Sequence, residues 1–98
     1  MEELIYNFTV WVNECDPEVL RKGLDEIIDK SGYTVLNKME HHFQPVGYTH
    51  LWLLAESHLA VHTFPENGKT YIELSSCNKE KNELFKSLFA QWQSVQKK

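Results

Sequence analysis

Apolar and polar residues alternate along the chain in two different patterns, and these patterns predict the order of its elements. Five segments are rich in β-branched and aromatic residues, as strands are, and they cover residues 4–12, 33–43, 48–55, 59–63 and 70–76. Two other segments place apolar residues three and four positions apart, which is the spacing of an amphipathic helix. The order β-α-β-β-β-β-α predicts an α+β fold, a two-layer sandwich of an antiparallel sheet with two helices on one face.

Both predicted helices have recognisable ends. Asp16 provides a capping carboxylate for the first helix and Pro17 its first residue, while Ser31 and Gly32 end it. The apolar face of this helix consists of Leu20, Leu24, Ile27 and Ile28. Asn78 can cap the second helix. The apolar stripe of the second helix consists of Leu84, Phe85, Leu88, Phe89 and Trp92. We expect Phe85, Leu88 and Trp92 of this stripe to belong to the core.

Two short segments predict turns between strands. Pro45 and Gly47 separate the second strand from the third. Asn67-Gly68 separates the last two strands and is typical of a type I′ hairpin turn, in which both central residues need a positive φ. Because no linker or internal repeat interrupts this series, we expect residues 1–98 to form a single domain.

The composition limits the functions that so short a chain can have. Its 98 residues, 42% of them apolar, are enough for one modest core. A net charge of −4 argues against nucleic acid as a partner, and no apolar run approaches the roughly 18 residues that a membrane span needs. The acidic residues 1–4 are unlike a signal peptide. We therefore expect a cytoplasmic protein in which Cys15 and Cys77 are reduced thiols.

The reactive side chains of the sequence are concentrated in its second half. A Glu-Ser-His-Leu motif fills residues 56–59, and His62 follows Ser57 by five positions. Thr-Phe-Pro-Glu fills residues 63–66, and Cys77 follows Ser57 by twenty positions. In this order and spacing the residues resemble those of the prokaryotic S-adenosylmethionine decarboxylase proenzymes.

The resemblance extends beyond this motif, over roughly residues 4–92. Cys-Asp-Pro-Glu at residues 15–18 is similar to the strand-to-helix corner of the family. His-Phe-Gln-Pro-Val-Gly at residues 42–47 resembles the segment before its third strand, and Thr49 fits a small hydroxyl position that follows.

The resemblance implies that the chain makes its own cofactor. In such proenzymes a serine hydroxyl attacks the preceding carbonyl, and elimination from the resulting ester cuts the chain and leaves a pyruvoyl group. Here Ser57 would attack the carbonyl of Glu56, and the cut would fall between these two residues. By the same matching, His62 serves this processing and Thr49 assists it.

The resemblance also implies the decarboxylation of S-adenosylmethionine, a step in the synthesis of spermidine and other polyamines. The pyruvoyl group forms a Schiff base with the substrate and withdraws electrons as carbon dioxide leaves. Cys77 matches the thiol that then returns a proton. The residues that match substrate contacts are Phe43 and Phe64 for the adenine and sulfonium, Glu66 for the ribose, and Leu59 through its backbone.

A homodimer is implied as well, because the family's active sites lie close to a dimer interface. The segments 4–12 and 48–55 are too apolar to face water on both sides. A sheet that has helices on one face only would leave the other face in need of cover. We expect the second copy of the chain to bind there.

Two alternative functions stay open at this stage. Around the thiol, Glu73 stands where the family usually has Asp and Asn78 where it often has Gly, and Phe64 replaces a larger aromatic residue. The given sequence also ends soon after the second helix, where relatives usually continue into another strand. These departures are compatible with a pyruvoyl-dependent decarboxylase of arginine or ornithine. The other alternative is an unprocessed, non-catalytic relative that binds a nucleoside-like ligand or a partner protein.

Most of the candidate residues also have a purely structural interpretation. Ser57 is otherwise a turn residue, Cys77 a small buried side chain, and Phe43 and Phe64 core aromatics. If residues 57–62 form one straight strand, His62 points to the opposite face from Ser57, so processing would require a turn or bulge near Glu56.

The five histidines raise the possibility of a zinc site. His58 and His62 are four residues apart, which places them about 13 Å apart on a strand. Only Cys77 could join them, and no second thiol has the spacing of a structural zinc site. We therefore expect no metal site.

Overall fold

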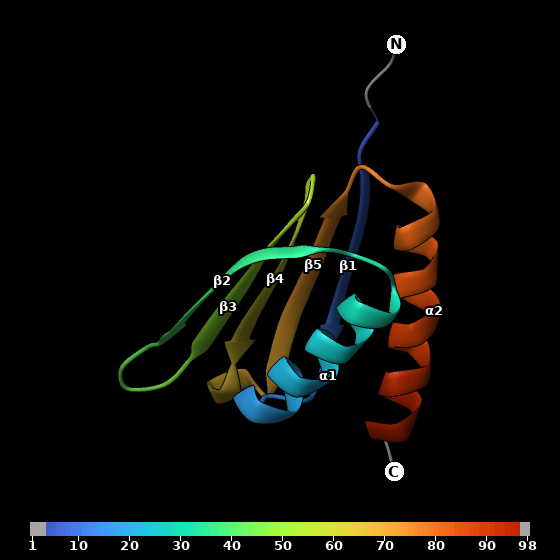
Figure 1. Cartoon of the computed structure of the whole chain (residues 1–98). Coiled ribbons are helices and arrows are strands. Elements are labelled where there is room, and N and C mark those ends of the chain that lie inside the picture. Colours follow the sequence, from blue (N-terminus) through green and yellow to red (C-terminus); the bar gives the residue numbers. More distant parts are fainter. Residues whose placement is uncertain (1–3, 97–98) are drawn as a thin grey trace.

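A computed structural model describes residues 4–96 and has the predicted order of elements (Figure 1). The strands are β1 (Tyr6–Val12), β2 (Val35–His42), β3 (Tyr48–Leu54), β4 (Ser57–Phe64) and β5 (Lys69–Ser76). The helices are α1 (Pro17–Lys30) and α2 (Lys79–Gln96), and a short 3₁₀ helix, η1 (Pro65–Asn67), links β4 to β5. Neither α-helix within these described residues is both long and apolar enough to cross a membrane.

The five strands form one antiparallel sheet in the order β1-β5-β4-β3-β2. Both helices lie on the same face of it (Figure 1), so the predicted α+β two-layer sandwich is confirmed. No helix among residues 4–96 lies on the other face, which we call the open face. The β3–β4 turn lies at one end of the sheet, at the top of Figure 1, and η1 lies at the opposite end.

The core lies between the sheet and the helices, where the alternation of side chains along each strand points every second residue. Trp52, Leu59 and Ile72 from the three central strands are fully buried there. The fully buried or nearly buried helix residues that pack on them are Leu20, Leu24, Ile27, Ile28, Phe85 and Phe89. Leu88 and Trp92 are partly buried against this core. Leu84, which belongs to the same apolar stripe of the sequence, is 45% exposed.

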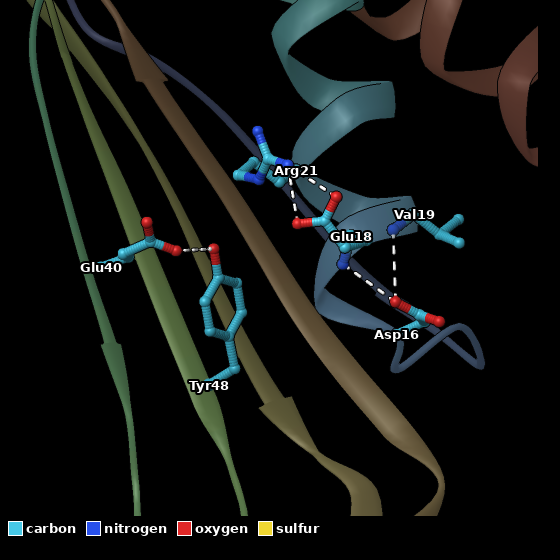
Figure 2. Close-up of polar contacts among 6 residues, drawn as sticks. All are labelled: Asp16, Glu18, Val19, Arg21, Glu40 and Tyr48. Atoms are coloured by element: carbon cyan, nitrogen blue, oxygen red, sulfur yellow. Dashed lines mark hydrogen bonds and ion pairs between the residues drawn. The ribbon is translucent and has the colours of Figure 1, made fainter.

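The predicted ends of the helices are confirmed. The Asp16 side chain accepts hydrogen bonds from the backbone N–H groups of Glu18 and Val19 at the start of α1 (Figure 2). Gly32 follows α1 with a φ of 88°, which an L-residue adopts only at a cost. Asn78 accepts a bond of 2.9 Å from the Lys81 N–H at the start of α2.

The connection between β4 and β5 differs from the predicted type I′ turn. Pro65 begins the 3₁₀ turn of η1, and the Gly68 N–H closes it with a bond of 3.1 Å to the Pro65 carbonyl. Within this turn only Gly68 has a positive φ, of 64°, whereas a type I′ turn requires a positive φ at Asn67 as well. Proline favours this outcome because its ring fixes φ near the helical value.

The start of β4 also differs from its predicted position. β4 begins at Ser57, two residues earlier than the predicted segment 59–63, because Ser57 pairs directly with Leu54. Ala55 and Glu56 are then the only residues between the two strands. Glu56 has a φ of 60°, the only positive φ of a non-glycine residue in the described chain. This left-handed conformation costs an L-residue about 1–2 kcal/mol.

The strand β3 contains one buried histidine, on the face of the sheet that carries the helices. His50 is 2% exposed, and its ring stacks on that of Trp52 with 3.8 Å between the centroids. Its Nδ1 is buried without a hydrogen-bond partner among the described residues. The neighbouring Tyr48 donates a bond of 2.7 Å to Glu40 (Figure 2). Burial lowers the pKa of His50 below its ordinary value near 6.5, although Glu40 and Asp25 partly oppose this.

Acidification should therefore destabilise the fold through His50. As the pH falls below about 6.5, the unfolded chain binds a proton at this histidine before the folded chain does, so the free energy of unfolding decreases. His50→Leu should remove this part of the pH dependence. Urea unfolding followed by circular dichroism at pH 7.5, 6 and 5 measures it. The exposed His41 provides the control, because His41→Gln should keep the wild-type pH dependence of the free energy of unfolding. The same pH dependence in His50→Leu as in the wild type would contradict the prediction.

Candidate functional site

Ser57 lies at the first position of β4, immediately after the β3–β4 turn. Its side chain faces the helices and is 9% exposed. The Oγ atom accepts a long hydrogen bond of 3.4 Å from the backbone N–H of Cys77 and donates one of 3.3 Å to the Oγ of Ser76. The hydroxyl group of Ser57 is thus held in place by the end of the neighbouring strand β5.

Glu56 and Cys77 lie on either side of this serine. Glu56 is the residue with positive φ, so the carbonyl group before Ser57 belongs to a strained position of the backbone. Cys77 follows β5 directly and is an exposed free thiol. We call Glu56, Ser57 and Cys77 the serine cluster. The structure brings these three predicted residues together.

A shallow pocket of about 440 Å³ opens beside the serine cluster. Its lining includes all three residues of the cluster together with His58 and Ser75, which belong to the open face of the sheet. Ile5, Leu36, Leu53 and Leu54 complete the lining. The serine cluster is therefore accessible from the open face, although the Ser57 side chain itself points toward the helices.

His62 and Thr49 form a second group, on the open face. The His62 Nδ1 and the Thr49 Oγ1 are 3.0 Å apart, on paired positions of β4 and β3. His62 is also nearly parallel to the ring of Tyr71, at 6.4 Å between centroids. We call Thr49 and His62 the histidine cluster. The structure brings these two predicted residues to each other.

Within one chain, the histidine cluster does not reach the serine cluster. The strand β4 is continuous from Ser57 to Phe64, with no bulge in its pairing with either neighbour. His62 follows Ser57 by five positions of extended chain, which places them about 17 Å apart, and their side chains point to opposite faces. The turn that was expected near Glu56 exists, but it precedes Ser57 and leaves His62 on the far side of the sheet.

Three of the four residues matched to substrate binding are dispersed over the end of the sheet opposite the serine cluster. Phe64 is 39% exposed at the end of β4, where its ring is 5.9 Å from that of Trp11. Phe43, 48% exposed, lines a separate pocket of about 350 Å³ with Thr63 and Pro65. The exposed Glu66 belongs to η1.

Leu59, also matched to substrate binding, lies apart from the other three residues. Its side chain is fully buried in the core, so only its backbone is available to a ligand. These side chains therefore do not form one pocket in a single chain.

A polar chain that the sequence analysis did not identify crosses the open face between the two clusters. The Tyr71 hydroxyl donates a bond of 2.8 Å to Glu73, which raises the pKa of Tyr71. The other oxygen of Glu73 is 3.9 Å from the Nε2 of His58. Only period-two alternation along β4 and β5 could have predicted that these side chains share a face.

Tyr33 is a further residue that the sequence analysis missed. Its hydroxyl group donates a hydrogen bond to Ser76, which in turn contacts Ser57. Because 43 positions separate Tyr33 from Ser76, no local pattern indicates this contact.

Metal binding gains no support from the geometry of the described residues. Among residues 4–96, no group of three or more His, Cys, Asp or Glu side chains is arranged to hold a metal ion. His58 and His62 both lie on the continuous strand β4, as the spacing argument assumed.

Comparisons with known proteins agree with the architecture and with the family resemblance. The family model of S-adenosylmethionine decarboxylase matches residues 6–96. The S-adenosylmethionine decarboxylase proenzyme of Prochlorococcus marinus (strain MIT 9313) is 44% identical over 62 residues, which are 63% of this chain and 50% of that protein. The proenzyme of Thermotoga petrophila is 34% identical over 73 residues, 68% of this chain and 56% of its own length. The chain spans about half the length of the curated relatives that it matches.

A solved structure also shares the fold. The crystal structure of the adenosylmethionine decarboxylase from Aquifex aeolicus VF5 superposes with a TM-score of 0.76 at 21% identity, over 96% of this chain and 83% of that one. At this identity the likeness shows the fold alone. The sequence resemblance is confirmed by the family model, which covers nearly the whole described chain. The chain belongs to the S-adenosylmethionine decarboxylase family.

Proposed function

We propose that this chain is a self-processing, pyruvoyl-dependent S-adenosylmethionine decarboxylase that acts in polyamine synthesis. The observation that supports the proposal most directly is the serine cluster. A serine hydroxyl lies directly after a strained residue and beside a free thiol, in the order that the family membership leads us to expect. The pyruvoyl group would supply the electron sink for decarboxylation of an amino acid.

In the proposed processing, Ser57 first converts the peptide bond before it into an ester. The Oγ–carbon bond to the Glu56 carbonyl forms, the carbon–nitrogen bond breaks, and the hydroxyl proton passes to the nitrogen. Removal of the Ser57 α-proton then breaks the bond between Cβ and Oγ of Ser57. The oxygen leaves as part of the new C-terminal α-carboxylate of Glu56, and the chain is cut. Water then hydrolyses the imine that the amino nitrogen of residue 57 forms. The nitrogen leaves as ammonia, and residue 57 becomes the ketone of the pyruvoyl group. The positive φ of Glu56 favours the first step, because the strained turn is released when the peptide bond is lost.

The separation of the two clusters supports a homodimer as the processing unit. His62 is the proposed base for the Ser57 α-proton, yet within one chain the two lie about 17 Å apart on opposite faces. Suppose two copies stack their open faces about a two-fold axis that runs across the strands. The beginning of one β4 then lies over the end of the other. Each serine cluster would meet the histidine cluster of the partner subunit.

The composition of the open face fits a second copy of the chain. Its exposed apolar side chains include Trp11 from β1 and Leu51 and Leu53 from β3, the two strands from which the contact was expected. Met39 and Phe64 extend the same face. The small Ala60 lies at its centre, between Leu51 and Glu73 in the strand register, and would allow two sheets to approach closely. Covering this face would remove exposed apolar surface from water.

Cys77 is the proposed proton donor in the reaction on the substrate. Cys77 is an exposed free thiol that lines the pocket of the serine cluster, and its backbone N–H bonds to the Ser57 Oγ over 3.4 Å. Phe43, Phe64 and Glu66 lie at the opposite end of the same chain. In the stacked dimer the partner subunit would present them to the pyruvoyl group, so the substrate would also bind between two copies.

Intact-protein mass spectrometry tests the proposal. The wild-type chain should yield fragments 1–56 and 57–98, the second with a blocked amino terminus and a mass deficit from the loss of ammonia. Ser57→Ala should stay at full length, because it lacks the attacking hydroxyl group. Release of labelled carbon dioxide from S-adenosylmethionine should follow cleavage. Release from arginine or ornithine alone would contradict the substrate, and a wild-type chain that remains uncut at neutral pH would contradict the function.

A further inference from the structure

We propose that Ser76 and Tyr33 orient the Ser57 hydroxyl group for attack on the Glu56 carbonyl, an inference that rests on the proposed self-cleavage. Ser76 contacts the attacking oxygen directly, and Tyr33 is a positioning residue that acts through Ser76. Neither belongs to the motif by which the chain resembles its relatives.

The three hydroxyl groups form a chain that is shielded from solvent. Ser57 donates to the Oγ of Ser76 over 3.3 Å, and the Tyr33 hydroxyl donates to the same oxygen. Ser57 is 9% exposed, Ser76 1% and Tyr33 7%. Water therefore has little access to the Ser57 proton, and the orientation of this hydroxyl depends on protein groups.

Three donors lie within hydrogen-bond distance of the Ser76 oxygen. Besides Ser57 and Tyr33, the backbone N–H of Asn78 donates to it over 3.0 Å, and Ser76 itself donates to the Asn78 carbonyl over 3.2 Å. A hydroxyl oxygen has two lone pairs, so the three donors compete. The bond from Ser57 is the longest of the three, and it is the one that can be lost most easily when Ser57 moves toward the carbonyl.

This arrangement directs the Ser57 proton away from the reacting carbon. A nucleophilic oxygen needs a lone pair toward the carbonyl. The Ser57 hydroxyl donates its proton to Ser76 and accepts one bond from the Cys77 N–H, which leaves one lone pair free for the attack. The Asn78 carbonyl takes the proton of Ser76, and the Tyr33 hydroxyl group holds the Ser76 oxygen in this orientation, so Ser76 has no proton to donate to Ser57. Without the Tyr33 hydroxyl, Ser76 could rotate and donate to Ser57, which would occupy a lone pair that the attack requires.

Tyr33 is well placed for this role because the end of α1 fixes its backbone. Its N–H bonds to the Ile28 carbonyl over 3.3 Å, directly after the left-handed Gly32. The Lys81 ammonium lies 5.7 Å from the centre of its ring. Burial raises the pKa of Tyr33, so its hydroxyl group stays a neutral donor throughout the neutral pH range.

The rate of self-cleavage in freshly synthesised protein tests the inference. Chains are made in a cell-free system, and samples taken over time are quenched in acid and weighed by mass spectrometry. Loss of one orienting hydrogen bond should slow cleavage roughly fivefold in Tyr33→Phe and about tenfold in Ser76→Ala. Ser76→Thr keeps the hydroxyl group and should restore most of the wild-type rate.

A matched control removes a different buried hydroxyl group from the same region. Ser31 precedes Tyr33 by two residues and donates a bond of 2.7 Å to the Ile27 carbonyl, but it has no contact with Ser57. Ser31→Ala should lose stability and cleave at the wild-type rate. Circular dichroism verifies that each variant is folded, and Tyr33→Phe decides the matter if Ser76→Ala does not fold.

Hydroxylamine identifies the step that is slowed, because it cuts esters and leaves amides intact. In Tyr33→Phe and Ser76→Ala the delay precedes the ester, so no hydroxylamine-sensitive chain should accumulate, whereas it should in His62→Ala. If the wild-type chain is cut and both variants are cut at its rate, the inference is wrong and the proposed function stands. A wild-type chain that is never cut would overturn both.

Discussion

Mixing the Ser57→Ala chain with the His62→Ala chain should restore cleavage of the His62→Ala chain, although neither variant is cut alone. In a mixed dimer, the intact Ser57 of one chain would meet the intact His62 of the other. This expectation follows from the proposed dimer, because β4 holds the two residues about 17 Å apart on opposite faces within one chain. With equal amounts and random pairing, about half of the His62→Ala chains should be cut.

The mixing experiment requires that subunits exchange. The two variants are unfolded together in urea, refolded by dilution and analysed by native mass spectrometry, which counts mixed dimers. Intact-mass analysis then shows which chain was cut, since the two differ in mass. Refolding each variant alone is the control. If mixed dimers form and neither chain is cut while the wild type is, then His62 does not act across the interface.

Truncation of Phe85 should remove a large part of the stability of the domain. Its side chain is fully buried, edge-on to Phe8 at 6.0 Å and stacked on Phe89 at 6.2 Å between centroids. Phe85→Ala leaves a cavity that the sheet and the helices cannot close, which typically costs 3–5 kcal/mol. A domain of this size has a free energy of unfolding of only about 5–10 kcal/mol. Urea unfolding followed by circular dichroism measures the loss.

The neighbouring Leu84 is a control from the same helical turn. It is 45% exposed, so Leu84→Ala should change the free energy of unfolding by no more than about 0.5 kcal/mol. A loss in Leu84→Ala comparable to that in Phe85→Ala would mean that α2 packs on the sheet through a different face.

Most of the fold was predictable because each element repeats one simple pattern. Strands and helices follow from the spacing of apolar residues, and Asp16 and Asn78 cap the helices as their side-chain chemistry indicates. Leu84 is exposed although it belongs to the apolar stripe, because it lies about 100° from Phe85 around the helix axis, at the edge of the stripe. The predicted type I′ turn between β4 and β5 was wrong because Pro65 begins a 3₁₀ turn that includes Asn67.

The candidate site was harder to predict because sequence spacing does not give direction. The residues of the motif occur in the expected order, yet period-two alternation places Ser57 and His62 on opposite faces. Spacing alone cannot tell whether such residues meet within a chain or between chains. The contact of Tyr33 with Ser76 joins positions 43 apart, and it depends on how α1 packs over the end of the sheet rather than on any local signal.

The order of strands in the sheet has a consequence for the product of the proposed cleavage. A cut between Glu56 and Ser57 would leave β1, α1, β2 and β3 in one fragment and β4, β5 and α2 in the other. The strands of the second fragment lie between those of the first, with β5 paired to β1 and β4 paired to β3. The smaller fragment would thus be hydrogen-bonded to a strand of the larger one on each side. The mature protein would hold together without a covalent link between the fragments. The chain would have to fold before it is cut, because this interleaving is completed while both pieces still belong to one chain.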